Sequence, residues 1–150
     1  SDFFFDDFHH NGALLQSYIA AFAVFGYQKD KPTTEAWYNS EMARFRESKV
    51  ADGYDFNLSQ GPLKNFTEKY HKDNFFWNQI VEHPNYDDFW QKRNLLPHLI
   101  NVKHSVMTVG GWYDAEDLYG PLNIYKKIES SSKGAFNTLV MGPWSHGDWA

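Results

Sequence analysis

Two motifs in the second half of the chain each end in a residue that can hold or transfer a proton. Gly-Gly-Trp-Tyr precedes Asp114, and Gly-Pro-Trp-Ser precedes His146. A carboxylate that accepts a hydrogen bond from one imidazole nitrogen fixes the ring, and the other nitrogen can then take the proton of a serine hydroxyl. The pair therefore indicates the acid and the base of a serine hydrolase. In the alternative interpretation, Asp114 only caps a helix and His146 is a surface turn residue.

The elements around these motifs are predicted to be two strands and a helix. Apolar runs over Ser105–Val109 and Phe136–Met141 predict strands, and helical spacing of apolar residues predicts a helix over Tyr119–Ile128. Strand, helix and strand within this length form a βαβ unit of a parallel sheet. Catalytic groups gather beyond the carboxyl ends of such strands, so adjacent strands would bring Asp114 and His146 together.

The first 96 residues have a helical and aromatic pattern instead. Helices are predicted over residues 13–25, from 33 or 34 to 45, over 75–81 and over 86–92, and an extended segment or ordered loop over 51–63. We therefore predict an α/β chain that forms part of an α/β-hydrolase fold. Residues 1–96 would be a helical cap whose start overlaps the α/β core. Residues 97–150 would be the C-terminal part of that core, carrying the acid and the histidine.

No serine of the chain lies in the Gly-x-Ser-x-Gly pattern of hydrolase nucleophiles. Ser59 comes nearest, but Asn57 replaces the first glycine and the segment does not join an apolar strand to a helix. Ser145 adjoins His146, and neighbouring residues on a turn seldom point at each other. We therefore expect the nucleophile upstream of Ser1, in a longer protein of which this chain, inactive by itself, is a segment.

The composition limits the other classes of function. The chain has 150 residues, of which 42% are hydrophobic and 19% aromatic, and this favours a folded domain over a disordered one. A net charge of −5 argues against nucleic acid as a partner, and the absence of cysteine excludes disulfides and thiolate ligands. No apolar run reaches the roughly 18 residues of a membrane span. His9 and His10 would point to opposite faces of an extended segment, and no further ligand set accompanies them, so we predict neither a metal nor a cofactor.

The acid and histidine motifs together resemble those of the CocE/NonD hydrolase family, which is related to the X-Pro dipeptidyl-peptidases (family S15). The segment Asp114-Ala-Glu-Asp117 is similar to the Asp-x-Glu-Asp motif of the α-amino acid ester hydrolases in that family. The segment Asp6-Asp-Phe-His-His-Asn-Gly-Ala13 is similar to one that these enzymes carry after the nucleophile. The resemblance implies an α/β-hydrolase fold with Asp114 as the triad acid and His146 as the general base.

The resemblance also implies a carboxylate cluster that binds the α-ammonium group of a substrate. Its members would be Glu116, Asp117 and either Asp6 or Asp7, of which Asp7 is favoured. Glu116 and Asp117 would face the substrate's amino end while Asp114 faces the histidine. Carboxylates that lie close together repel each other, and an ammonium group relieves that repulsion through charge-assisted hydrogen bonds. In the alternative interpretation, Glu116 and Asp117 are solvated acids at the start of a helix, where the helix dipole favours them.

The function implied is that of a serine hydrolase that cleaves esters or amides of α-amino acids or β-lactam-type acyl compounds. An X-Pro dipeptidyl-peptidase, a glutaryl-acylase and a non-catalytic amine-binding domain are the alternatives. The substrate would be a small molecule or a peptide, and Trp112 and Tyr113 would wall its apolar pocket unless they pack in the core. Relatives imply a periplasmic or secreted protein that forms homo-oligomers, without a nucleic-acid or membrane partner.

Overall fold

The structure is a computed structural model that describes residues 1–27, 30–32 and 46–148. The chain has two compact units: a sheet unit, Ser1–Leu14 with Tyr86–Ala150, and a helical unit, Leu15–Asn85. None of the helices that the described residues form is long and apolar enough to cross a membrane.

The division into units differs from the predicted domain boundary at residue 96. Contacts with the N-terminal segment bring residues 86–96 into the sheet unit. The Tyr86 hydroxyl donates a hydrogen bond to Asp2 Oδ2 at 2.7 Å, and the Leu95 N–H donates to the Ser1 carbonyl at 3.0 Å. The first fourteen residues therefore belong with the C-terminal half of the chain and not with the helices that directly follow them.

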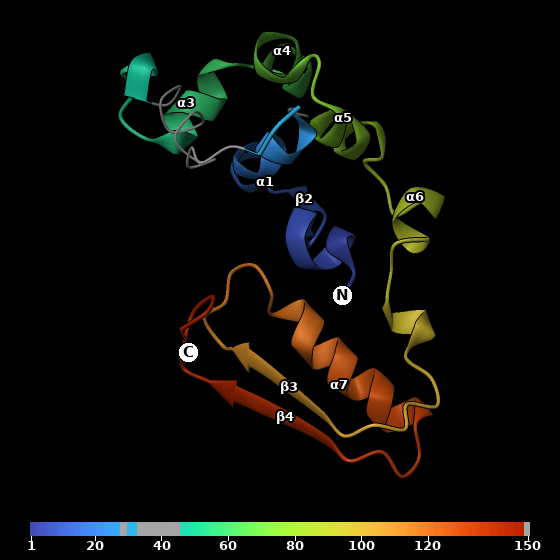
Figure 1. Cartoon of the computed structure of the whole chain (residues 1–150). Helices are drawn as coiled ribbons and strands as arrows, with labels where there is room; N and C mark the ends of the chain where they lie inside the picture. The colour runs from blue at the N-terminus through green and yellow to red at the C-terminus, as the bar shows by residue number, and fades with distance from the viewer. Residues whose placement is uncertain (28–29, 33–45, 149–150) are drawn as a thin grey trace. The chain divides into compact units, whose positions relative to one another are not determined.

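The sheet unit contains the predicted βαβ unit (Figure 1). β3 (Val106–Gly111) and β4 (Asn137–Gly142) pair in parallel and in register along their whole length. α7 (Tyr119–Ser131) connects the two strands. The strands and the helix predicted here are confirmed, with small shifts at their ends.

α7 covers one face of this sheet. The Asn137 side-chain amide on β4 donates to the Tyr125 carbonyl on the helix at 3.2 Å. A Cβ atom on Gly110 of β3 would lie 3.0 Å from Pro121 of the helix, so the backbones of the two elements approach closely there. Ile128, on the same helix, is 2% exposed.

The N-terminal segment forms a turn and a hairpin within the sheet unit. η1 (Phe4–Phe8) is a π-helical turn, and β1 (His9–His10) pairs with β2 (Ala13–Leu14) in an antiparallel hairpin. Asn11 and Gly12 form the hairpin turn with positive φ angles of 51° and 86°. An Asn-Gly pair favours this type I′ geometry, because both residues tolerate the left-handed region.

Two short helices and an aromatic cluster complete the sheet unit. α6 (Asp88–Gln91) lies within the helix predicted over residues 86–92, and η4 (Leu96–His98) follows it. The Phe4 ring centroid lies 5.5 Å from that of Trp90 and 5.3 Å from that of Tyr86. Phe4 and Trp90 are both buried, so they anchor the N-terminal turn against α6.

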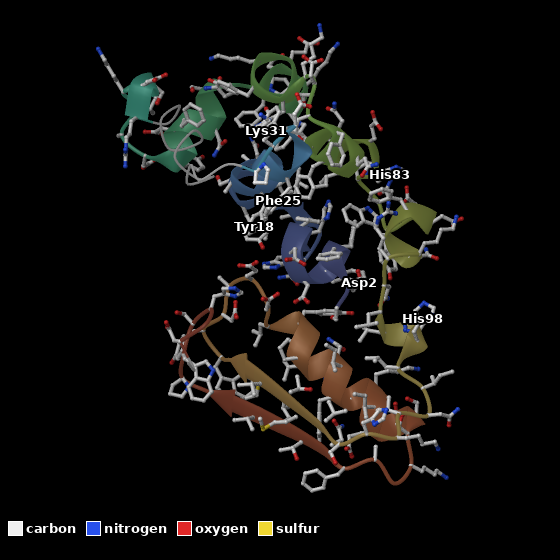
Figure 2. The ribbon with its side chains drawn as sticks, in the orientation of Figure 1. Asp2, Tyr18, Phe25, Lys31, His83 and His98 are labelled. Carbon is white, nitrogen blue, oxygen red and sulfur yellow. The ribbon has the colours of Figure 1, made fainter. Side chains whose placement is uncertain are left out.

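The helical unit consists of short segments packed around buried aliphatic and aromatic side chains. In chain order these are α1 (Gln16–Phe22), η2 (Ala23–Gly26), α3 (Gly53–Ser59), α4 (Leu63–Phe66), η3 (Thr67–His71) and α5 (Phe75–Glu82). The helix predicted over 13–25 is confirmed from Gln16 onward as α1 and η2, but its first two residues, Ala13 and Leu14, form β2 instead because they pair with β1 in the hairpin. The helix predicted over 75–81 is confirmed as α5. The helix predicted up to residue 45 lies outside the described residues. Tyr18 and Phe25, labelled in Figure 2, lie on either side of Phe22 in sequence, with ring centroids 4.7 Å and 5.7 Å from its own.

The prediction of an extended segment or loop over residues 51–63 is wrong. The segment forms α3, whose start is capped by the Asp52 side chain, which accepts the Asp55 N–H at 2.9 Å. The alternation of Tyr54, Phe56 and Leu58 with polar residues suggested an extended segment. In the helix only Phe56 is buried, whereas Tyr54 and Leu58 are 74% and 64% exposed, so the alternation does not reflect a buried face.

Candidate active site

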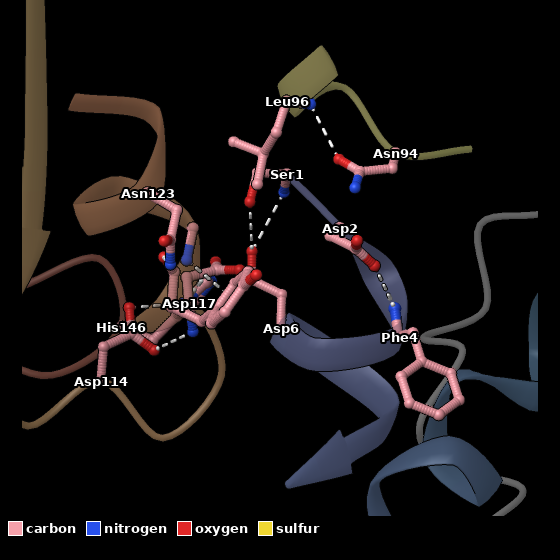
Figure 3. A network of polar contacts seen from close by, with 12 residues as sticks. Ser1, Asp2, Phe4, Asp6, Asn94, Leu96, Asp114, Asp117, Asn123 and His146 are labelled. Carbon is pink, nitrogen blue, oxygen red and sulfur yellow. Dashed lines mark hydrogen bonds and ion pairs between the residues drawn. The ribbon is translucent and has the colours of Figure 1, made fainter. Parts of the chain in front are cut away.

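Asp114 and His146 lie beyond the carboxyl ends of β3 and β4 (Figure 3). His146 Nδ1 is 3.2 Å from Asp114 Oδ2. A carboxylate can only accept a hydrogen bond, so Nδ1 carries the proton of this contact. Nε2 is then the nitrogen that can accept a proton from a hydroxyl group. The structure thus brings the two side chains together in the way that the strand order predicts.

The other oxygen of Asp114 holds the loop that precedes α7. Oδ1 accepts the backbone N–H groups of Glu116 and Asp117, both at 2.9 Å. Asp114 therefore caps a turn and faces His146 at the same time. This turn ends before α7, which begins at Tyr119. Glu116 and Asp117 therefore lie in the loop directly before the helix and not within its first turn.

Glu116 and Asp117 also approach His146. Asp117 Oδ2 lies 3.3 Å and Glu116 Oε2 3.7 Å from the Nδ1 atom that Asp114 contacts. That these two acids face the amino end of a substrate stays a prediction, and the structure adds their approach to the ring that Asp114 contacts. All three carboxylates surround one edge of the imidazole ring.

These contacts determine the protonation of the pair. Burial lowers the pKa of His146, but the carboxylates of Glu116, Asp114 and Asp117 outweigh it, and the pKa lies above its ordinary value. Burial raises the pKa of Asp114, but the N–H groups of Asp117 and Glu116 and the His146 ring outweigh it, and this pKa is lowered. Burial raises the pKa of Asp117, and the carboxylates of Asp6, Glu116 and Asp114 add to that effect. The arrangement therefore favours an ionised Asp114 and a readily protonated His146.

Glu116→Gln should lower the pKa of His146, because it removes a negative charge 3.7 Å from Nδ1. The ring is favoured as a cation in the folded chain, so its contribution to stability is present below the ordinary pKa of 6.5 and is lost as the pH rises through the higher folded pKa. An NMR titration of the His146 ring should show its transition at lower pH in the variant. Glu68→Gln is the matched control, since Glu68 is exposed and pairs with Lys64. An unchanged His146 transition in Glu116→Gln would contradict the geometry.

Asp6 and Asp7 have different surroundings. Asp6 is 1% exposed, and its Oδ1 accepts the N–H of Gly120 at 2.9 Å, whereas Asp7 is partly buried. Carboxylate oxygens of Asp6, Asp7 and Asp117 lie within 4.8 Å of one another, as do ligand atoms of Asp114, Asp117 and His146. The structure brings both candidates to Asp117, and Asp6 additionally joins the N-terminal segment to α7. Such a group of carboxylates suits a cation, a substrate ammonium group included.

Gly120→Ala should destabilise the sheet unit by about 1–3 kcal/mol. A methyl group on Gly120 would lie 2.4 Å from Asp6 Oδ2, and the Asp6 side chain is buried and cannot move away easily. This cost exceeds the gain of about 1 kcal/mol or less that alanine normally brings to a helix. Gly53→Ala is the control, because a Cβ there meets nothing within 4 Å. Urea unfolding measures the stability of both variants. A Gly120→Ala chain as stable as the wild type, or more stable, would contradict the close packing of Gly120 against Asp6.

A pocket of about 710 Å³ lies beside these groups within the sheet unit. Asp114 and Glu116 line it together with the apolar side chains of Phe5, Leu118 and Leu122. His9 also lines it, is 4% exposed, and has a pKa that burial lowers. Lys126 belongs to the lining as well, so the pocket combines apolar walls with charged groups of both signs.

Trp112 and Tyr113, which are predicted to wall a substrate pocket, have exposed side chains. They follow β3 and are 55% and 73% exposed, so they do not pack in the core of the described structure. Neither belongs to the lining of the pocket described above, whose apolar wall is formed by Phe5, Leu118 and Leu122. Any contact of these two aromatic residues with a substrate stays a prediction.

The serines of the two weak nucleophile candidates have hydroxyl groups engaged locally. The Ser145 hydroxyl donates to Asp148 Oδ2, and the Ser145 N–H donates to the same oxygen at 3.2 Å. The Ser59 hydroxyl lies within α3 and donates to the Phe56 carbonyl at 2.7 Å. Neither contact involves the imidazole, so the structure does not bring the Ser59 or the Ser145 hydroxyl group to His146 as a nucleophile.

Comparison with known proteins identifies the family. The family model described as X-Pro dipeptidyl-peptidase (S15 family) matches residues 1–148. The chain belongs to this S15 family. The S15 chain is 30% identical to the cocaine esterase of Rhodococcus sp. (strain MB1 Bresler) over 69 residues, which cover 46% of the chain and 11% of the esterase. The family that the motifs suggested is thereby confirmed.

A solved structure extends the similarity to almost the whole S15 chain. An aminopeptidase from the marine sediment archaeon Thaumarchaeota archaeon is 26% identical, with a TM-score of 0.73. The similarity covers 96% of this chain and 23% of the aminopeptidase. The S15 chain therefore spans well under half the length of either relative.

Some features of the site in this S15 chain were not predicted from the sequence. The hairpin that carries His9 and His10 follows from the Asn-Gly pair at residues 11–12, a turn signal that could have been used. The contact between Asp6 and Gly120 joins residues 114 positions apart, and no local pattern indicates it.

Proposed function

We propose that residues 1–150 supply the acid and the base of a serine hydrolase whose nucleophile lies in a longer polypeptide containing this segment. The observation that carries the proposal is the 3.2 Å contact between His146 Nδ1 and Asp114 Oδ2 beyond two parallel strands. It leaves Nε2 as the proton acceptor for a serine hydroxyl. Attack by that serine on an ester or amide carbonyl would form an acyl-enzyme, which water then hydrolyses.

The strands β3 and β4 would then belong to the sheet of an α/β-hydrolase fold. Parallel sheets are covered on both faces in proteins, and α7 covers one face of this pair. Met107 on β3 and Val140 on β4 are 69% and 36% exposed, which supports further cover from the longer polypeptide. Both relatives named above are longer than this chain, which supports the same inference.

The substrate class that the site supports is an ester or amide with a free α-amino group. Glu116 and Asp117 lie beside Asp114 and bring negative charge to the place where the acyl part of a substrate would bind. A peptidase that acts at an amino terminus, as the name of the aminopeptidase implies for that protein, would need such a site. The same geometry allows an X-Pro dipeptidyl-peptidase; a glutaryl-acylase, whose acyl group is anionic, gains nothing from these carboxylates.

A non-catalytic amine-binding domain would share the carboxylates but would have no use for an oriented imidazole. The contact of His146 with Asp114 therefore favours the enzyme over the binding domain. One assay distinguishes the enzyme from the binding domain: hydrolysis of a chromogenic α-aminoacyl ester by the longer polypeptide. Stoichiometric binding without turnover would support the binding domain.

Residues 1–150 alone should not hydrolyse an activated ester. Neither Ser145 nor Ser59 offers its hydroxyl group to His146, because Ser145 donates to Asp148 and Ser59 donates to the Phe56 carbonyl. Release of nitrophenol from a nitrophenyl ester should equal that of the His146→Ala segment. Faster release that is lost on this substitution would place the nucleophile inside the segment and overturn that part of the proposal.

A further inference from the structure

Trp144 lies against the two glycines that end β3 and β4. A Cβ atom on Gly142 would be 2.0 Å from Cζ3 and 2.1 Å from Cη2 of the indole ring. A Cβ atom on Gly111 would be 2.1 Å from the Trp144 carbonyl oxygen and 2.8 Å from Cδ1. Trp144 therefore fills the space that side chains at both positions would occupy, and only glycine permits this.

The ring lies on the face of the sheet that α7 does not cover. Gly110 faces Pro121 of α7, and successive residues of a strand point to opposite faces. Gly111 therefore points away from α7, and Gly142, its partner in the parallel register, shares that face.

Two backbone hydrogen bonds join the loop after β3, which carries Asp114, to the loop after β4, which carries His146. The Tyr113 N–H donates to the Trp144 carbonyl at 3.2 Å, and the Trp112 N–H donates to the Gly142 carbonyl at 2.9 Å. Tyr113 directly precedes Asp114, and Trp144 precedes His146 by two residues. The contact between the Asp114 and His146 side chains therefore lies within two residues of these backbone hydrogen bonds.

We propose that Trp144 is the positioning residue of the Asp114–His146 pair. Its ring, resting on Gly111 and Gly142, keeps its carbonyl against the Tyr113 N–H and so holds the two loops at the spacing that the side-chain contact needs. The His146 side chain is 55% exposed, so burial alone does not fix it. The catalytic meaning of this role rests on the proposed function, but the positioning itself does not.

The test compares Trp144→Ala, Trp144→Phe and Gly142→Ala with the control Gly53→Ala, all in the 150-residue chain. ¹⁵N NMR of the His146 ring reports whether Nδ1 carries the proton, and its titration reports the effect of the carboxylates of Asp114, Glu116 and Asp117. We expect Trp144→Ala and Gly142→Ala to move the transition towards the ordinary value of 6.5 and to mix the two neutral tautomers. Trp144→Phe should restore part of the wild-type behaviour, because it keeps a ring on the glycines.

A folded Trp144→Ala chain with the wild-type His146 titration and tautomer would overturn the proposal. If Gly142→Ala fails to fold, the comparison of Trp144→Ala with Trp144→Phe still tests the proposed positioning role. In the longer polypeptide, Trp144→Ala should lower kcat by about 100-fold, since a misplacement of about 1 Å costs that much, while KM changes little. If the NMR changes appear but the wild-type polypeptide hydrolyses nothing, the positioning role stands and the proposed function fails.

Discussion

His146→Ala in the longer polypeptide should lower kcat for an aminoacyl ester by about 10⁴- to 10⁶-fold, because members of a catalytic triad act as a unit. Asp114→Asn should cost about 10⁴-fold for a more specific reason. The Asn oxygen can still accept the N–H groups of Glu116 and Asp117, which Asp114 Oδ1 holds at 2.9 Å. The side-chain NH₂ then faces His146 Nδ1 and favours the tautomer in which Nε2 carries the proton and cannot act as the base.

The control for this prediction is His104→Ala, because His104 is an exposed histidine outside the site. Circular dichroism should show that Asp114→Asn keeps its fold, since the turn is preserved. Steady-state kinetics with a nitrophenyl aminoacyl ester measure all three variants. A loss of less than about tenfold in either site variant would mean that the pair has only a structural role.

Glu116→Gln combined with Asp117→Asn should abolish the preference for substrates that carry an α-amino group. A charge-assisted hydrogen bond is worth about 1.5–3 kcal/mol, so the ratio of kcat/KM for an α-amino ester to that for its des-amino analogue should fall by about 10- to 150-fold. The loss should appear mainly in KM, since the ammonium contact exists before and during the reaction.

The approach of both acids to His146 Nδ1, at 3.7 Å and 3.3 Å, adds a condition to this experiment. Removing their charges lowers the pKa of His146 and moves the acidic limb of the pH profile to lower pH. The two substrates must therefore be compared on the pH plateau, where His146 is neutral in wild type and variant alike. Equal losses for the amino ester and the des-amino ester there would show that Glu116 and Asp117 are structural.

The C-terminal half of the fold could be predicted from the sequence because its signals are local. The apolar runs that became β3 and β4 end at glycines, and the helical spacing between them became α7. Parallel pairing of the strands then places Asp114 near His146 without further information. Residues 51–63 carry two conflicting signals. Asp52 is a helix-capping residue and favours α3, whereas the alternation of apolar and polar residues favours an extended segment. The alternation misled the prediction because it does not correspond to a buried face.

Other parts of the site depend on contacts between distant segments, and no local pattern reveals them. Asp6 and Asp7 are neighbours of the same type, and no local pattern indicates that Asp6 is the one that packs against Gly120. The division into units depends on Tyr86 reaching Asp2, 84 residues away. The contact of Trp144 with Gly111 and Gly142 likewise requires the strand register to be known.

The most direct test of the central claim is labelling of the longer polypeptide with a fluorophosphonate, followed by peptide mass spectrometry. This reagent modifies a serine only where a neighbouring base activates the hydroxyl group. We predict one labelled serine outside residues 1–150, with labelling lost in His146→Ala and retained in His104→Ala. Labelling of Ser145 or of any other serine within the segment, or a labelling rate that is unchanged in His146→Ala, would contradict the assignment of Asp114 and His146 as acid and base.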